Sequence, residues 1–229
     1  MFQSILLFLN SIIRHIESPL CLRCGSYFSE KNYFCRKCTN YFLLNYFEKI
    51  ALDYHQLVQV TSFIRWPKNE SDTLSELVYL LKTRTSTAAW AWFVQAIESE
   101  ICNLISSDPG CILIPVPGSK ESSYHTLNFG NAIQNLTGCQ SVPLLRKAAG
   151  QKNQKTQTAL ERTAAKFEIN EEFTGRLENI HQIYLIDDIV TTGATLKNIS
   201  KILRQSLSLD QQEKIKITGL TLFYRTKAP

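Results

Sequence analysis

Residues 183–196, with the sequence IYLIDDIVTTGATL, constrain the fold more than any other stretch of the chain. Four apolar residues with strand character come first, and two adjacent acids, Asp187 and Asp188, follow them. A turn rich in threonine then leads into a second apolar-periodic segment, which predicts a helix over residues 194–207. A strand that runs through polar residues and a tight turn into a helix is typical of an open α/β sheet, which binds ligands at the carboxyl ends of its strands.

The turn after the acid pair (Asp187 and Asp188) predicts an anion-binding site. Backbone N–H groups of a tight turn at the start of a helix attract anions, and the helix dipole adds to that attraction. The hydroxyl groups of Thr191, Thr192 and Thr195 can donate further hydrogen bonds. A ligand with a phosphate at one end and vicinal hydroxyls at the other, such as a ribose 5-phosphate, suits the turn and the acids together. The alternative is a buried parallel strand with an acidic region before its helix.

This arrangement resembles the phosphoribosyl pyrophosphate (PRPP) signature of type I phosphoribosyltransferases. In that family the two acids hold the 2′- and 3′-hydroxyls of the ribose, and the loop after them holds the 5′-phosphate. The resemblance implies that the acid pair serves both binding and catalysis. It also implies Mg²⁺, which would bridge the pyrophosphate and the ribose hydroxyls. The PRPP-binding residues of the loop would be those of the Thr–Gly turn: Thr191, Thr192, Gly193, Ala194 and Thr195.

Four cysteines near the N-terminus predict a zinc site. They form two C-x2-C pairs separated by ten residues: Cys21 with Cys24, and Cys35 with Cys38. Each pair can present two thiolates to one metal ion, and two pairs complete a tetrahedral structural zinc site. The alternatives are disulfides, which a cytosolic chain disfavours, and a redox C-x-x-C motif, which would not need a second copy. We therefore expect a small zinc ribbon that binds structural Zn²⁺.

The chain is expected to form two units. Residues 1–50 would hold an amphipathic helix and the zinc ribbon, and residues 51–229 an α/β domain. The N-terminal helix lacks the charged flank and the cleavage site of a signal peptide, and no apolar run is long enough to span a membrane. We therefore expect a cytoplasmic protein with no membrane partner.

Alternating strands and helices over residues 111–229 predict a parallel sheet flanked by helices. Apolar runs and their turn residues set the expected bounds of each element. Strands are expected at residues 57–66, 111–117, 141–145, 183–187 and 215–224, and helices at residues 74–82, 88–105, 124–136 and 194–207.

The combination of motifs resembles the ComF/GntX family of competence-related proteins, which carry an amidophosphoribosyltransferase-like domain. It comprises the four-cysteine module, the Ile-Pro-Val-Pro strand end at residues 114–117, and the acid pair with its turn. The segment LVYLLK at residues 77–82 resembles the family's apolar-lysine segment, and a second family stretch is matched by Gln157, Leu160 and Arg162. The resemblance implies a type I phosphoribosyltransferase-like fold and PRPP binding.

The same resemblance implies a role in natural transformation, through imported single-stranded DNA in the cytoplasm or a DNA-processing protein partner. The alternatives are a metabolic phosphoribosyltransferase with an unknown acceptor, and a non-enzymatic PRPP-sensing module that docks a protein partner. If the chain is an enzyme, it would transfer a phosphoribosyl group and release pyrophosphate.

Positive charge is concentrated in one part of the chain. The formal net charge is +5, and residues 146–166 alone carry +5, from six basic residues against one acid. This basic stretch (residues 146–166) can neutralise a pyrophosphate leaving group, contact nucleic acid, or form a solvated helix face. Lys120, in the loop after Pro117, is the other cation that we expect near the pyrophosphate.

The remaining histidines and cysteines predict no further site. Four histidines show no metal-ligand spacing, and each is expected on the surface or at a helix cap: His15, His55, His125 and His181. Of these, only His125 lies near the loop that is predicted to bind pyrophosphate. Three further cysteines occur singly among apolar residues and are expected to be buried: Cys102, Cys111 and Cys139.

Overall fold

The computed structural model describes residues 24, 26, 35–54, 58–66, 78, 81–82, 87–118, 124–147 and 167–225. The predicted N-terminal helix, Cys21, Lys120 and residues 148–166 of the basic stretch lie outside the described residues. Of the helix predicted over residues 74–82, only Val78, Leu81 and Lys82 are described, and the first two are helical.

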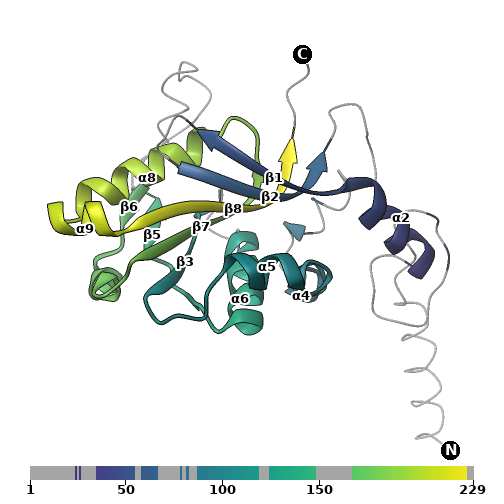
Figure 1. The fold of residues 1–229 in the computed structure, drawn as a ribbon, viewed down its shortest axis with the longest axis horizontal. Coiled ribbons are helices and arrows are strands. Elements are labelled where there is room, and N and C mark those ends of the chain that lie inside the picture. Colours follow the sequence, from purple (N-terminus) through teal and green to yellow (C-terminus); the bar gives the residue numbers. More distant parts are fainter. Residues whose placement is uncertain are drawn as a thin grey trace, which may run out of the picture.

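A six-stranded sheet with the order β1-β2-β8-β7-β3-β4 forms the centre of the protein (Figure 1). Only the pair β1–β2 is antiparallel, and the other neighbours run parallel. The sequence prediction of an α/β fold with a mostly parallel sheet is therefore confirmed. The strands are β1 (Phe47–Tyr54), β2 (Val58–Trp66), β3 (Cys111–Pro115), β4 (Gln140–Ser141), β7 (Gln182–Val190) and β8 (Lys216–Arg225).

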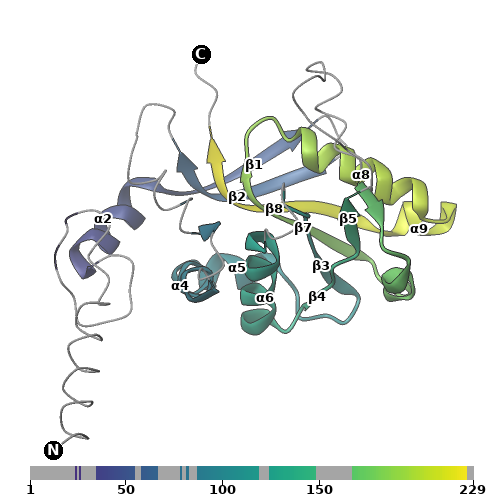
Figure 2. The same ribbon diagram turned by 180° about the vertical axis from the view of Figure 1, so that it is seen from behind.

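Helices cover both faces of this sheet, as the two opposite views in Figures 1 and 2 show. Alternate residues of β7 divide the core between the faces, because neighbouring side chains of a strand point to opposite sides. Tyr184 and Ile186 pack with the helices of one face, and Ile183 and Leu185 pack with those of the other. The first face carries α4 (Thr87–Ala96), α5 (Glu98–Leu104) and α6 (His125–Thr137), and the second carries α8 (Ala194–Ser206) and α9 (Leu209–Lys214).

Three smaller elements complete the described fold. Helix α2 (Arg36–Tyr46) precedes β1, and a 3-10 helix, η2 (Glu171–Leu177), precedes β7. A separate antiparallel pair joins β5 (Leu145–Lys147) to β6 (Phe167–Ile169), with Lys147 opposite Phe167. Within the described ranges, no helix is both long enough and apolar enough to cross a membrane.

Gly219 on β8 lets α8 approach the sheet closely. A Cβ atom at this position would lie 2.8 Å from a methyl group of Val60 on β2 and 3.0 Å from a methyl group of Leu196 on α8. Both distances are too short for carbon atoms, so any larger residue would push the helix or the neighbouring strand away. The approach matters for function because the start of α8 carries the Thr–Gly turn.

Several predicted bounds are wrong, and most of the differences have a local cause. The helix predicted over residues 88–105 is broken at Ile97, which caps α5 with a non-helical backbone. The strand predicted over residues 141–145 is two strands, because Pro143 has no N–H to donate to a ladder. Strand β1 and helix α9 were not expected; α9 begins with a capping box formed by Ser208 and Gln211.

The structure also bears on the expected boundary between the two units and on the three single cysteines. The boundary expected between residues 50 and 51 falls inside β1, so the first strand of the sheet joins the two expected units. Cys111 and Cys139 are buried as predicted, whereas Cys102 is exposed.

Candidate functional site

The acid pair lies on β7, where the two neighbouring strands, β3 and β8, end at different positions along it. On one side, β3 pairs with β7 only as far as Pro115 opposite Ile186. On the other side, β8 stays paired with β7 up to Val190. Strand β7 is therefore longer than predicted, but both acids lie just beyond the end of β3, at the carboxyl edge of the parallel sheet.

The Thr–Gly turn joins the end of β7 to the start of α8. Gly193 has a φ angle of 67°, a left-handed conformation that costs other residues about 1 kcal/mol or more, and it caps the helix. The backbone N–H of Ala194 donates a hydrogen bond to the Thr192 hydroxyl at 3.4 Å. Thr191, Thr192 and Thr195 are exposed, so their hydroxyl groups are accessible at the start of a 13-residue helix.

Backbone hydrogen bonds orient both carboxylates. The N–H of Asp188 donates to Oδ1 of Asp187 at 2.9 Å, and the N–H of Ile189 donates to Oδ1 of Asp188 at 2.9 Å. Asp188 is buried on the face of the sheet that α6 covers, and Asp187 is partly exposed. In each carboxylate one oxygen is thus fixed by the backbone, and the second oxygen is held in a defined direction.

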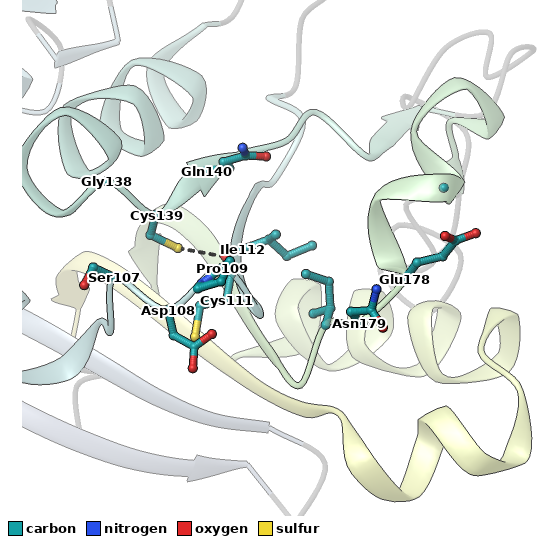
Figure 3. A pocket seen from close by; sticks show the side chains of 12 residues that line it. Ser107, Asp108, Pro109, Cys111, Ile112, Gly138, Cys139, Gln140, Glu178 and Asn179 are labelled. Carbon is teal, nitrogen blue, oxygen red and sulfur yellow. Dashed lines mark hydrogen bonds between the residues drawn. The ribbon is translucent and has the colours of Figure 1, made fainter.

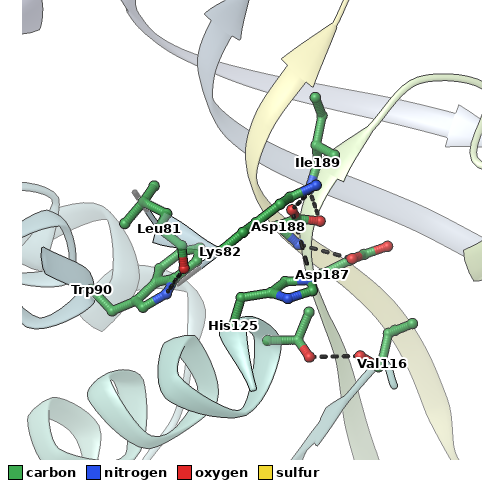
Figure 4. Close-up of polar contacts among 9 residues, drawn as sticks. Leu81, Lys82, Trp90, Val116, His125, Asp187, Asp188 and Ile189 are labelled. Atoms are coloured by element: carbon green, nitrogen blue, oxygen red, sulfur yellow. Dashed lines mark hydrogen bonds and ion pairs between the residues drawn. The ribbon is translucent and has the colours of Figure 1, made fainter. Parts of the chain in front are cut away.

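Lys82 and His125 meet Asp188 from two different elements (Figure 4). The Lys82 ammonium lies 2.9 Å from Oδ2 of Asp188, and Nε2 of His125 lies 3.8 Å from the same oxygen. His125 is only 7% exposed, so the expectation of a surface or capping histidine is wrong. It is the first residue of α6, and the helix places it over the acid pair.

A packed framework fixes the positions of Lys82 and His125. The N–H of Lys82 donates to the Val78 carbonyl at 3.1 Å, which closes a helical turn. The indole N–H of Trp90 donates a hydrogen bond at 3.0 Å to the carbonyl of Leu81, the residue before Lys82. Trp90 also stacks on Phe129, with ring centroids 4.7 Å apart, and Phe129 lies one turn after His125 on α6.

The start of α6 is also fixed to the end of β3. The hydroxyl of Thr126 donates to the carbonyl of Val116, just beyond the strand, at 2.6 Å. Val116 in turn donates its N–H to the Ile186 carbonyl of β7 at 2.9 Å. This chain of contacts connects the residue after His125 to the residue before Asp187, so the histidine and the acids belong to one rigid unit.

Burial and charge shift the pKa values of two groups in this site. Burial raises the pKa of Asp187 well above its ordinary value, and the charge of Asp188 raises it further. Burial lowers the pKa of His125; the Asp188 charge partly opposes that shift, and the Lys82 charge adds to it. Both pKa shifts favour the uncharged forms of Asp187 and His125 beside the ion pair between Lys82 and Asp188.

Three cysteines form a second cluster, the cysteine cluster (Cys24, Cys35 and Cys38). Their sulfur atoms lie within 4.8 Å of one another, and the Sγ atoms of Cys24 and Cys35 are 3.8 Å apart. Tetrahedral zinc with bonds of about 2.3 Å requires sulfur atoms roughly 3.8 Å apart. A disulfide would require about 2.05 Å. The donor set therefore suits a metal ion, and it is the part of the predicted four-cysteine site that falls in the described residues.

Helix α2 supports this cluster electrostatically and by packing. Cys35 immediately precedes the helix, and a backbone hydrogen bond from Cys38 lowers the pKa of the Cys35 thiol. Cys38 is buried and contributes to the core beneath α4 and α5. A metal ion bound here would connect the start of α2 to that core.

A pocket of about 450 Å³ lies at the opposite edge of the sheet (Figure 3). It is lined by the residues at the amino ends of β3 and β4, including Asp108, Cys111 and Gln140, and by Glu178 and Asn179 after η2. Of the predicted site residues that the structure describes, none is among those that line it. The cavity and the chemically distinctive residues are therefore at different ends of the parallel strands, and sheets of this type bind ligands at the carboxyl end.

Of the predicted pyrophosphate-binding residues, the structure describes only the start of the basic stretch. Lys120 lies outside the described residues, as does most of the basic stretch. Its first two residues are described: Arg146 and Lys147 on β5 pair with Glu168 and Phe167 on β6, just after the stretch. The antiparallel pair brings the two ends of the basic stretch together.

The roles of Lys82 and His125 were not found by sequence reasoning about the site. Lys82 ends the apolar segment at residues 77–82, and that pattern marked the residue but not its partner. His125 begins the helix that follows the Ile-Pro-Val-Pro strand end and its loop. That position in the sequence could have indicated that His125 lies near the carboxyl edge of the sheet. Comparison of the chain with known protein families and with curated proteins returns no match.

Proposed function

We propose that the chain binds PRPP, with the ribose on the acid pair and the 5-phosphate on the Thr–Gly turn. One observation carries the proposal: the acids and the turn are adjacent at the carboxyl edge of a parallel sheet, at the start of a 13-residue helix. The turn offers backbone N–H groups and accessible threonine hydroxyls to a phosphate, and the carboxylates offer acceptors to a vicinal diol.

The proposal includes a type I phosphoribosyltransferase-like fold for the domain. The mostly parallel sheet with helices on both faces is compatible with it. In this reading the basic stretch and Lys120 neutralise the pyrophosphate, and Mg²⁺ arrives with PRPP, bound to pyrophosphate oxygens. Transfer to an acceptor, if it occurs, would release that pyrophosphate.

We further propose that the cysteine cluster and Cys21 bind one structural zinc ion. Support comes from the sulfur spacing of 3.8 Å and from the second C-x2-C pair in the sequence. Four thiolates complete the tetrahedral coordination that structural zinc prefers.

The narrower proposal is a ComF-type role in natural transformation in the cytoplasm, with single-stranded DNA or a DNA-processing protein as partner. It rests on the combination of zinc module, PRPP signature and local charge of +5 in the basic stretch. A metabolic phosphoribosyltransferase and a PRPP-sensing module remain the alternatives. Binding to single-stranded DNA should weaken with salt, with a slope of roughly −0.7 per phosphate contacted; an affinity independent of salt contradicts a DNA-binding role.

The direct test is a calorimetric titration of the full chain with PRPP and Mg²⁺. We expect one site per chain in the wild type and no detectable binding in the double variant Asp187→Asn, Asp188→Asn. Asp210→Asn is the matched control, because Asp210 is an exposed acid paired with Lys214 on α9. Unchanged binding in the double variant would reject the site. A screen for pyrophosphate release with candidate acceptors then separates an enzyme from a sensor.

A further inference from the structure

We propose that the Lys82 ammonium occupies the cation position of a latent metal site formed by His125, Asp187 and Asp188. As a result, the acid pair takes a sugar diol without a metal ion on its carboxylates. The identity of the diol rests on the proposed function, whereas the assignment of the cation does not.

The latent metal site is defined by geometry. One ligand atom from each of His125, Asp187 and Asp188 lies within 4.8 Å of the other two. Two carboxylates and an imidazole are a donor set that divalent manganese binds readily. By residue type and spacing alone, these three residues would be assigned to a metal ion.

Lys82 makes a metal ion at this site unfavourable, because its ammonium group already contacts Oδ2 of Asp188. The ammonium nitrogen is 2.9 Å from Oδ2 of Asp188. A divalent ion bound to the same oxygen at about 2.1 Å could lie no farther than roughly 5 Å from the ammonium. Repulsion at that distance is strong in a partly buried site, so the lysine and the metal ion exclude one another.

The lysine is held in place by the fold rather than by the ion pair alone. Trp90 binds the Leu81 carbonyl next to Lys82 and stacks on Phe129 of α6, the helix that begins with His125. The ligand set and its cation are therefore positioned by the same aromatic contact between Trp90 and Phe129. Figure 4 shows the path from the Trp90 side chain through Leu81 and Lys82 to Asp188. Lys82 is 44% exposed along its side chain, yet its ammonium reaches a carboxylate that is only 8% exposed.

Asp188 can accept a further hydrogen bond, and a sugar hydroxyl can donate it. Among the described residues, Oδ2 of Asp188 is buried and contacts the Lys82 ammonium at 2.9 Å, but no hydroxyl or amide group donates a hydrogen bond to it. A buried carboxylate oxygen of this kind gains from a hydroxyl donor. The lysine supplies the compensating charge, and the ligand supplies the hydrogen bond.

Manganese binding to the zinc-loaded full chain tests the assignment. Electron paramagnetic resonance should detect no Mn²⁺ at the acid pair of the wild type. Lys82→Met should bind one Mn²⁺ per chain, at least about tenfold more tightly than the wild type, because the competing charge is gone. Adding His125→Gln to that variant should abolish the new site. The cysteine cluster does not compete, since thiolates prefer zinc to manganese.

Three variants keep the test interpretable. Lys82→Arg retains the charge and should bind no Mn²⁺. Lys201→Met, an exposed lysine on α8, should behave as the wild type. If Lys82→Met does not fold, Lys82→Gln removes the charge while keeping a polar end and gives the same measurement. Equal Mn²⁺ binding in the wild type and the uncharged variants overturns the proposal, as does the absence of binding in both.

Ribose 5-phosphate provides the second arm, because it has the diol and the phosphate but no pyrophosphate to carry Mg²⁺. Its affinity for the wild type should be the same with and without Mg²⁺. Lys82→Met should bind it about tenfold more weakly in metal-free buffer and should recover with Mn²⁺. A wild type that needs a divalent ion for this ligand overturns the proposal. Gain of Mn²⁺ binding in a chain that binds neither ribose 5-phosphate nor PRPP would remove the proposed function and leave the cation assignment intact.

Discussion

Two clusters in this protein look like metal sites: one is built from thiolates, and the other is built from carboxylates and an imidazole that an ammonium group already contacts. The cysteine cluster joins three soft thiolate donors at the start of α2. The cluster of His125, Asp187 and Asp188 joins harder donors at the edge of the sheet, and Lys82 contacts it at 2.9 Å. Donor type alone therefore does not decide whether a metal ion binds.

The comparison teaches that the chain must be searched for its own cations before a metal is assigned. Soft thiolates at this spacing suit a zinc ion, and a structural metal then stabilises the fold. Carboxylates that already have an ammonium partner remain available for a neutral polar ligand. The two clusters thus predict opposite responses to metal removal.

Metal removal should have its largest effect at the cysteine cluster. Cys24→Ser should release the metal and unfold the segment around α2, because structural zinc contributes on the order of 10 kcal/mol, comparable to the whole stability of a domain. Zinc content and hydrogen exchange along α2 measure the outcome. Cys102→Ser, at an exposed cysteine, is the matched control. Full protection of α2 in metal-free Cys24→Ser would show that the cluster is not structural.

Loss of the acid pair should have the next largest effect, and it should appear only with ligand. PRPP at a hundred times its dissociation constant should stabilise the wild type by about 2.7 kcal/mol. Asp187→Asn with Asp188→Asn should remove that stabilisation, whereas Cys102→Ser should keep it. Thermal unfolding with and without PRPP measures the difference. A thermal shift of wild-type size in the double variant would mean that the two acids do not bind PRPP.

Removal of the Lys82 charge should have a moderate effect on the free protein. Lys82→Met leaves Asp188 buried without its partner, and we expect a loss of about 1 to 3 kcal/mol, less than for a fully buried pair because the lysine is partly exposed. The loss should disappear when Asp188→Asn is already present, since no charge then needs compensation. Urea unfolding of the four proteins in this cycle measures the coupling. Equal losses in both backgrounds would mean that the ion pair does not stabilise the fold.

The smallest expected effect is a pH dependence caused by Asp187. Its pKa is raised by burial above the ordinary value of 3.8, so the folded state holds this proton more firmly than the unfolded state. The resulting contribution to stability is complete below pH 3.8 and is lost as the pH rises through the raised pKa. Asp187→Asn should therefore gain stability relative to the wild type as the pH rises through that window.

Denaturant unfolding between pH 4 and pH 8 tests this dependence. His125 titrates in both proteins, so its contribution cancels in the difference as long as its pKa is unchanged. The difference between Asp210→Asn and the wild type should stay flat, because Asp210 is exposed. A flat difference for Asp187→Asn as well would mean that burial does not hold a proton on Asp187.

Local patterns predicted those parts of the protein whose cause is local. The parallel strand before the acids, the helix from Ala194 and the position of the Thr–Gly turn follow from apolar periodicity and from glycine at a left-handed cap. The missed capping box at Ser208 was readable in the same way. The break at Ile97 was not, because this buried residue belongs to an apolar run that is periodic on both sides.

The surroundings of the acid pair could not be predicted because they depend on tertiary contacts. Lys82 reaches Asp188 only because Trp90 fixes Leu81 and stacks on α6. His125 is buried only because Thr126 ties the helix start to the end of β3. No spacing in the sequence encodes these contacts, and the lack of metal-ligand spacing pointed to surface or capping histidines.

A crystal structure with ribose 5-phosphate bound to the full chain tests the central claim most directly. The diol should lie on Asp187 and Asp188 and the phosphate on the backbone N–H groups of the Thr–Gly turn, with the Lys82 ammonium still on Asp188. A ligand in the pocket at the opposite edge of the sheet, near Asp108 and Cys111, would contradict it. So would the absence of ligand from the acid pair at saturating concentration.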